Sequence, residues 1–255
     1  MAGTASAFAI ELRGVGKAFG EVVALTGITL LVPRQSRVGF VGPSGGGKTT
    51  LLRIVAGLLE SDTGLVRVED ATAARQRLAR CALMPQRDLL LPWRTALDNA
   101  AIALENRGAS RAEARRRTRP LFERFGLASF ENARPAQLSG GMCQRVSFLR
   151  TLMAGKDILL LDEPFGALDS ITRAQLQEWL VQAMDAVPRT VLLVTHDVEE
   201  ALLLSRRVVV LSQRPGRVVR VLEADHGFEG SRREIVTSPE FVSLKEQALE
   251  ALGHE

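Results

Sequence analysis

The stretch Gly42-Pro-Ser-Gly-Gly-Gly-Lys48-Thr49 decides the fold, because it fits the phosphate-loop pattern G-x-x-x-x-G-K-[ST]. In this pattern, backbone N–H groups surround nucleotide phosphates, the lysine reaches the β- and γ-phosphates, and the final hydroxyl holds Mg²⁺. A helix that opens at Lys48 would add the positive end of its dipole. We therefore expect the nucleotide to contact Gly42, Pro43, Ser44, Gly45, Gly46, Gly47, Lys48, Thr49 and Thr50.

A second stretch, Leu138-Ser139-Gly140-Gly141-Met142, precedes the apolar run Ile158-Leu-Leu-Leu-Asp162-Glu163. Ser139 and the glycines after it can offer a hydroxyl and bare N–H groups to a phosphate, although an ordinary helix N-cap would also satisfy them. The apolar run carries Asp162 to the carboxyl edge of a sheet, where an acid can hold the Mg²⁺ shell. Glu163 can polarise a water for attack on the γ-phosphate, and the upstream phosphate loop favours this interpretation over a solvated turn.

Short apolar runs alternate with helical patterns, which predicts an α/β fold in one domain of 255 residues. Strands are expected at 10–15, 28–32, 37–41, 65–68, 158–161, 190–194, 208–211 and 218–222, and helices at 48–56, 170–184 and from Ser238 onward. The middle of the chain has no convincing strand and is interpreted as an inserted helical subdomain. The expected parts are a core (about 1–94 and 155–225), a helical subdomain (about 95–154) and a C-terminal helical tail (about 226–255).

The composition disfavours several classes of protein. Two cysteines, Cys81 and Cys143, are too few for a disulfide framework or a zinc cluster, which favours a reducing compartment. No stretch approaches the roughly 18 apolar residues of a membrane helix, and the first residues do not resemble a signal peptide, so we expect any membrane role to be peripheral. The net charge of +4 comes from arginine. However, the densest run, Arg111–Arg119, is typical of the solvated face of an amphipathic helix rather than of a nucleic-acid surface.

These motifs, in this order, resemble those of the ATP-binding cassette (ABC) family over nearly the whole chain. The resemblance assigns Gln86 to sensing Mg²⁺ and the attacking water, His196 to contact with the γ-phosphate, and Gly166-Ala-Leu-Asp169 to a loop that crosses between subunits. It implies a phosphate-loop NTPase core with an antiparallel β subdomain and an inserted α-helical subdomain. It also implies ATP hydrolysis catalysed by Glu163, His196 and Gln86, with Mg²⁺ held by Thr49, Gln86 and Asp162.

The resemblance further implies a composite site. In this family the residues Ser139, Gly140 and Gly141 face the nucleotide of the other subunit, so the active form would be a homodimer or a paired cassette with ATP at the interface. Met142 stands where the broader family prefers glutamine. Because the chain has no tyrosine, adenine stacking would fall to Phe19, unless that ring belongs to the core.

Leu90-Leu-Pro92-Trp93-Arg-Thr95 and Asp162–Asp169 resemble the nitrate, sulfonate and taurine type of importer ATPase, whose relatives include importers of thiamine and riboflavin pyrimidine precursors. This implies a peripheral subunit on the cytoplasmic face of the inner membrane that drives a separate integral permease, with solute delivered by an extracytoplasmic binding protein. Exposed Leu90, Leu91 and Trp93 would form an apolar socket for the permease, unless they cover the core.

Two other classes compete with the importer interpretation. A soluble ABC-type ATPase acting on nucleic acid or in translation is disfavoured, because the chain holds one cassette and no long insertion between the phosphate loop and Leu138. A small-molecule kinase would explain the phosphate loop but not the stretch 138–142 or His196. We therefore expect no nucleic-acid partner.

Overall fold

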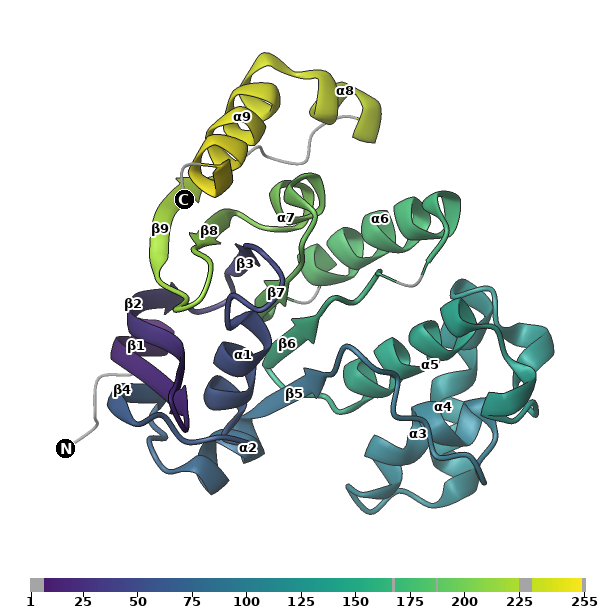
Figure 1. Ribbon diagram of the computed structural model, residues 1–255. Helices are drawn as coiled ribbons and strands as arrows, with labels where there is room; N and C mark the ends of the chain where they lie inside the picture. Colours follow the sequence, from purple (N-terminus) through teal and green to yellow (C-terminus); the bar gives the residue numbers. More distant parts are fainter. Residues whose placement is uncertain (1–6, 167, 187, 225–230, 254–255) are drawn as a thin grey trace.

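The computed structural model describes residues 7–166, 168–186, 188–224 and 231–253, and these residues form two sheets, the helices that pack on them, and a separate group of helices to one side (Figure 1). The larger sheet has six strands in the order β5-β6-β7-β3-β8-β9. Its strands are β3 (Arg37–Val41), β5 (Cys81–Met84), β6 (Ile158–Asp162), β7 (Thr190–Val194), β8 (Arg207–Leu211) and β9 (Val218–Glu223). The neighbouring pairs are parallel except for β8 and β9, which form an antiparallel pair at one edge.

The smaller sheet is antiparallel and has the strand order β2-β1-β4. Its strands, β1 (Phe8–Phe19), β2 (Val22–Pro33) and β4 (Thr63–Val68), contain the shorter strands expected from the sequence. Side chains such as Ile10 of this sheet share one buried cluster with Phe40 of β3 and Leu51. The expected antiparallel β subdomain is therefore confirmed, and its packing fixes the position of Phe19 relative to the phosphate loop.

Helices cover both faces of the larger sheet. They are α1 (Lys48–Ala56), α2 (Ala74–Arg80), α6 (Ser170–Ala186), α7 (Val198–Leu204), α8 (Arg232–Thr237) and α9 (Pro239–Gly253). Successive side chains of a strand point to opposite faces. Accordingly, Leu160 of β6 clusters with Leu51 of α1, whereas Leu161 clusters with Leu180 of α6. All residues of β3, β6 and β7 are buried, as expected for parallel strands covered on both faces.

The remaining helices, α3 (Ala96–Glu105), α4 (Arg111–Arg124) and α5 (Gly140–Met153), stand to one side of the sheet with two short 3₁₀ turns, η1 (Ala128–Phe130) and η2 (Pro135–Gln137) (Figure 1). The carboxylate of Asp98 is fully buried and pairs with Arg111 at 2.6 Å and Arg115 at 2.8 Å. Burial alone would raise the pKa of Asp98, but its hydrogen bonds with Arg111, Thr95 and Arg115 outweigh burial and hold that pKa below its usual range. The arginine-rich segment is thus an amphipathic helix, as predicted, whose charges hold the helical group together.

Some elements were not expected from the sequence: the strand β5 and the helices α2, α7 and α8.

The two cysteines are free and buried. None of the described helices is long and apolar enough to cross a membrane. Ala167 of the expected intersubunit loop, and parts of the expected C-terminal tail (225–230 and 254–255), lie outside the described residues.

Candidate nucleotide site

A cavity of about 300 Å³ opens at the phosphate loop. Its walls come from the turn between β1 and β2, the loop before α1, and the segments that follow β5, β6 and β8. Of the residues predicted to form the site, the cavity is lined by Phe19, Ser44, Gly45, Gly47, Lys48, Thr49, Thr50, Gln86 and Glu163. The structure therefore brings together residues that are up to 144 positions apart, from Phe19 to Glu163.

The phosphate loop requires glycine for two physical reasons. Gly45 and Gly47 have φ angles of 81° and 83°, in the left-handed region that L side chains avoid. Gly46 faces the turn between β8 and β9, where a Cβ atom would lie 2.7 Å from the carbonyl oxygen of Ser212. The loop can therefore curl tightly above the first turn of α1, which begins at Lys48 and points its free N–H groups into the cavity.

The Lys48 ammonium group already lies inside this loop. Its Nζ donates hydrogen bonds to the carbonyl oxygens of Gly42 at 2.7 Å and Pro43 at 2.8 Å. Burial lowers the pKa of Lys48, and the nearby Glu163 and Asp162 carboxylates oppose that shift. Phosphate oxygens entering the loop would give the ammonium group a negatively charged partner, which makes the site well suited to a polyphosphate.

Thr49 and Asp162 form the part of the site that fits a metal ion. The Thr49 hydroxyl donates to Oδ1 of Asp162 at 3.0 Å, and burial raises the pKa of this carboxylate despite that hydrogen bond. Among the described residues no cluster of three or more His, Cys, Asp or Glu side chains could hold a metal. A hydroxyl and one carboxylate, completed by water and phosphate oxygens, is the donor set that Mg²⁺ takes at nucleotide sites. The residues present therefore fit Mg²⁺.

Glu163 is held in an unusual backbone conformation, with φ at 49°. A non-glycine residue in this region stores strain and persists only when its surroundings impose it. Here the Glu163 N–H donates to the carbonyl of Val194 at 2.8 Å, and the Gln144 side chain donates to the Glu163 carbonyl oxygen at 2.8 Å. Gln144, on α5, was not predicted to take part in the site. Because its partner is a main-chain atom distant in sequence, no local pattern could have revealed it.

The side chain of Glu163 meets the two other predicted catalytic residues. Gln86 Nε2 donates to Glu163 Oε2 at 3.0 Å, and His196 Nδ1 lies 3.4 Å from Glu163 Oε1. Gln86 follows β5 and His196 follows β7, on either side of β6 in the sheet. The structure thus places the three side chains in one group at the carboxyl ends of adjacent strands.

Ser139, Gly140 and Gly141, which the resemblance assigns to the nucleotide of the other subunit, do not line this cavity. Ser139 is the N-cap of α5, and its hydroxyl accepts a hydrogen bond from the Met142 N–H at 3.3 Å. The local capping interpretation is therefore confirmed. Ser139 and Gly140 are nevertheless exposed, so one surface of the hydroxyl and of the helix terminus stays open.

Phe19 is half exposed at the edge of the cavity, with the Lys17 ammonium group 5.6 Å from its ring centre. The interpretation of Phe19 as a core residue is therefore wrong. Arg214 also lines the cavity, from the turn between β8 and β9. No local signal in the sequence assigns this residue to the site, because its approach to the phosphate loop depends on the pairing of distant strands.

The expected apolar socket needs a correction. Leu90 is buried in the main hydrophobic cluster and Leu91 is partly buried, because Asn99 bonds both the N–H and the carbonyl of Leu91 and turns this segment inward. Trp93 is 70% exposed, so its interpretation as a core residue is wrong. Leu89, which was not predicted, is the other exposed apolar side chain of this segment.

A doubly covered sheet, with a phosphate loop after one strand and an acidic pair after another, is the architecture of the phosphate-loop nucleoside triphosphatases. Comparison with known proteins is more specific. A family model described as ABC transporter matches residues 25–166. The chain belongs to the ABC transporter family, and it is an ATPase of that family.

The relatives that this chain resembles are import proteins. The taurine import ATP-binding protein TauB of Rhizobium johnstonii is 42% identical over 234 residues, which cover 90% of this chain and 89% of that protein. The aliphatic sulfonates import ATP-binding protein SsuB 1 of Rhodococcus jostii is 41% identical over 243 residues, which cover 95% of this chain and 93% of that protein. The predicted resemblance to the sulfonate and taurine subgroup is thereby confirmed.

Two solved structures of the same fold are described as dimeric. A dimeric bacterial ABC transporter cassette superposes with a TM-score of 0.78 at 32% identity, over 86% of this chain and 100% of that one. A dimeric ATP-binding cassette in a post-hydrolysis state, bound to ADP and Pi, superposes with a TM-score of 0.77 at 31% identity over the same shares. The predicted fold class is confirmed.

Proposed function

We propose that this ATPase energises the import of a small organic sulfonate, of the taurine or aliphatic sulfonate type, through a separate integral membrane permease. The names of the two import proteins above, each matched over most of its length, support this solute class. The subunit would sit at the cytoplasmic face of the inner membrane as a peripheral protein, and an extracytoplasmic binding protein would deliver the solute to the permease.

The observation that carries the catalytic assignment is the group formed by Glu163, Gln86 and His196. Glu163 is the general base: one carboxylate oxygen orients a water in line with the γ-phosphate and accepts its proton as the new P–O bond forms, while the bond between the γ-phosphorus and the bridging oxygen breaks and ADP leaves. Gln86 holds the other oxygen of this carboxylate and so fixes its orientation. His196 lies beside the carboxylate, where its ring N–H can stabilise charge that develops on the γ-phosphate.

The phosphate loop binds and orients the triphosphate. Lys48 and the N–H groups at the start of α1 neutralise the β- and γ-phosphates, and Phe19 stacks on the adenine. Thr49, Asp162 and Gln86 would hold Mg²⁺, which would supply positive charge to offset the negative charge of the phosphates. Arg214 adds a further cation at the same cavity.

The active form in this proposal is a dimer of cassettes, either two copies or a related pair. The exposed Ser139 and Gly140, together with the partly exposed Gly141, would dock on the nucleotide bound by the partner, which explains why they lie away from the cavity of their own chain. Support comes from the dimeric state of the similar solved structures. Trp93 and Leu89 would contact the permease, because they are the exposed apolar side chains of the segment after Gln86.

The substitution Glu163→Gln tests the catalytic assignment. The amide keeps the shape of the side chain but cannot accept the proton of the water, so ATP turnover should fall by about a hundredfold or more, while ATP still binds. Glu123→Gln, at an exposed position on α4, makes the same chemical change outside the site and should leave turnover unchanged. Turnover of the Glu163→Gln protein within about threefold of the unmodified protein would overturn the assignment. Uptake of labelled taurine by vesicles containing the permease, compared with uptake of nitrate, tests the solute class.

A further inference from the structure

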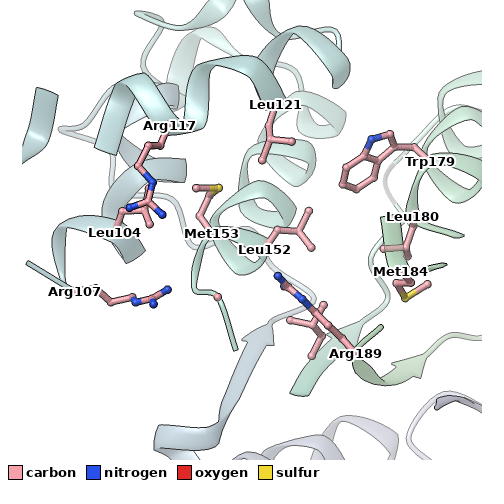
Figure 2. Close-up of a pocket in the computed structure, with 12 residues that line it drawn as sticks. Leu104, Arg107, Arg117, Leu121, Leu152, Met153, Trp179, Leu180, Met184 and Arg189 are labelled. Carbon is pink, nitrogen blue, oxygen red and sulfur yellow. The ribbon is translucent and has the colours of Figure 1, made fainter. Parts of the chain in front are cut away.

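A second cavity, of about 320 Å³, lies between the helical group and the core, away from the phosphate loop (Figure 2). On one side it is bounded by α3, α4 and α5 of the helical group. On the other side it is bounded by α6 and by the segment before β7. Cavities that hold small molecules fall in the range of about 300 to 1,000 Å³, so this one has room for a small ligand.

The walls of this cavity are largely apolar. Leu121 and Leu152 come from the helical group, whereas Trp179, Leu180 and Met184 come from α6. Figure 2 shows the Trp179 ring and the Leu121 side chain directed toward the space between α4 and α6. An apolar lining of this kind favours the hydrocarbon part of a ligand.

Three arginines supply the polar part of the lining: Arg107, Arg117 and Arg189. The described lining contains no aspartate or glutamate. In Figure 2, the Arg117 and Arg189 side chains extend toward the cavity from opposite sides, one from α4 and one from the core. Arg117 is exposed and Arg189 is partly exposed, so both guanidinium groups can donate charge-assisted hydrogen bonds to an anion at the open side of the cavity.

Two of these arginines, Arg117 and Arg189, lack among the described residues the side-chain partners that most arginines of α4 have. On α4, Arg115 pairs with Asp98, Arg116 with Glu113 and Arg119 with Glu131. Arg117, on the same helix, has no hydrogen bond or ion pair with any side chain that the structure describes, and Arg189 has none within that part of the chain either. Their N–H groups are therefore available for charge-assisted hydrogen bonds to a ligand.

We propose that this cavity binds a small amphiphilic organic anion, with its sulfonate, carboxylate or phosphate head between Arg117 and Arg189 and its hydrocarbon part against Trp179 and Leu152. A ligand in this position contacts the helical group through Arg117 and the core through Arg189, so its binding would join the two parts. The proposal concerns a free small molecule. It does not depend on the identity of the transported solute.

Tryptophan fluorescence offers a direct test, because the chain has two tryptophans and one of them lines the cavity. In a Trp93→Phe background, the emission of the full chain comes from Trp179 alone. Titration with hexanesulfonate or hexanoate should give a saturable change in this emission. Hexanol and hexylamine, which have the same chain with a neutral or a cationic head, should bind about tenfold more weakly or not at all, a difference of about 1.4 kcal/mol.

Substitutions then locate the head group. Arg117→Gln and Arg189→Gln should each weaken hexanesulfonate binding by about tenfold. Arg116→Gln, one position away and outside the lining, should leave it unchanged. Circular dichroism and melting curves establish that each variant is folded.

Four outcomes would overturn the proposal: no saturable change in Trp179 emission, equal binding of hexanol, equal effects of the Arg116 and Arg117 substitutions, or a response to anionic lipid vesicles but not to hexanesulfonate. The last would assign the arginines to a membrane surface instead. Since the readout is binding in the absence of ATP, a negative result would leave the proposed import function standing.

Discussion

Glu200, at the start of α7, should make the stability of the protein depend on pH. Its side chain is only 4% exposed, its Oε1 has no hydrogen-bond partner among the described residues, and burial together with the nearby Asp197 raises its pKa from 4.5 to about 7. Arg173 and Thr195 oppose this shift, and Glu163 adds to it. The folded protein therefore keeps a proton on Glu200 at a pH where the unfolded chain has lost it.

The sign of the effect follows from this difference in bound protons. Between pH 4.5 and about 7 the unfolded state binds fewer protons at this site, so the free energy of unfolding falls as the pH rises. At about 1.4 kcal/mol for each pKa unit, the shift from 4.5 to about 7 corresponds to a loss of about 3 kcal/mol. Glu200→Gln, which is neutral at every pH, should not suffer this loss. Part of this loss has already occurred at pH 5, so the stability of the variant relative to the unmodified protein should rise by about 2.5 kcal/mol between pH 5 and pH 8.

Urea denaturation at pH 5, 6, 7 and 8 measures this difference, because the free energy of unfolding is obtained at each pH for both proteins. Glu199→Gln is the matched control, since it removes a carboxylate from the adjacent, partly exposed position where Glu199 pairs with Arg232 and Lys245. If the Glu200→Gln protein and the unmodified protein lost stability in parallel over this range, the buried-carboxylate reasoning would be refuted.

Two further predictions concern the dimer and the exposed tryptophan. Ser139→Arg and Lys48→Ala chains should each lack ATPase activity but should recover part of it when they are mixed, because one of the two sites of a mixed dimer then carries neither change. If verified mixed dimers recovered no activity, the shared site would be contradicted. Trp93→Ala should alter the free energy of unfolding by less than about 1 kcal/mol, because the side chain is exposed, while reducing co-purification with the permease. The Trp179 ring centre lies 4.4 Å from that of Phe125, so Trp179→Ala should lower the free energy of unfolding by about 3 kcal/mol. If denaturant unfolding showed the Trp93→Ala protein to be less stable than the Trp179→Ala protein, the placement of the two rings would be contradicted.

The parts of the fold that could be predicted from the sequence are those with strong local signals. The apolar runs that became β3, β6 and β7 are buried along their whole length, and the glycines of the phosphate loop are required by its backbone. The strand β5, by contrast, has four residues, Cys81–Met84, without a β-branched side chain, so its sequence gives no strand signal by itself. It is a strand because β6 pairs with it.

The candidate site likewise contains residues that a local sequence motif identifies and residues that only tertiary packing brings there. Lys48, Asp162 and Glu163 follow from motifs in which neighbouring residues suffice. The resemblance to the importer subgroup led to the expectation that Leu90 is exposed, and three consecutive leucines give no periodicity that distinguishes an inward from an outward side chain. In the structure the direction of the Leu90 side chain follows from Asn99 of α3, whose side chain forms hydrogen bonds with the N–H and the carbonyl of the adjacent Leu91. Arg214 and Gln144 reach the site only through tertiary packing, and a single sequence carries no local trace of such contacts.

Helix α5 links Ser139, the residue expected to face the partner's nucleotide, to the backbone of Glu163. Its N-cap is Ser139. Gln144 lies roughly 7.5 Å further along the helix axis, and its side chain donates a hydrogen bond to the Glu163 carbonyl oxygen. An α-helix resists compression along its axis, because shortening would break its backbone hydrogen bonds. In the proposed dimer, a displacement imposed on Ser139 by the partner's nucleotide would therefore reach the strained Glu163 backbone almost undiminished. Each site could then sense the occupancy of the other across less than two turns of one helix.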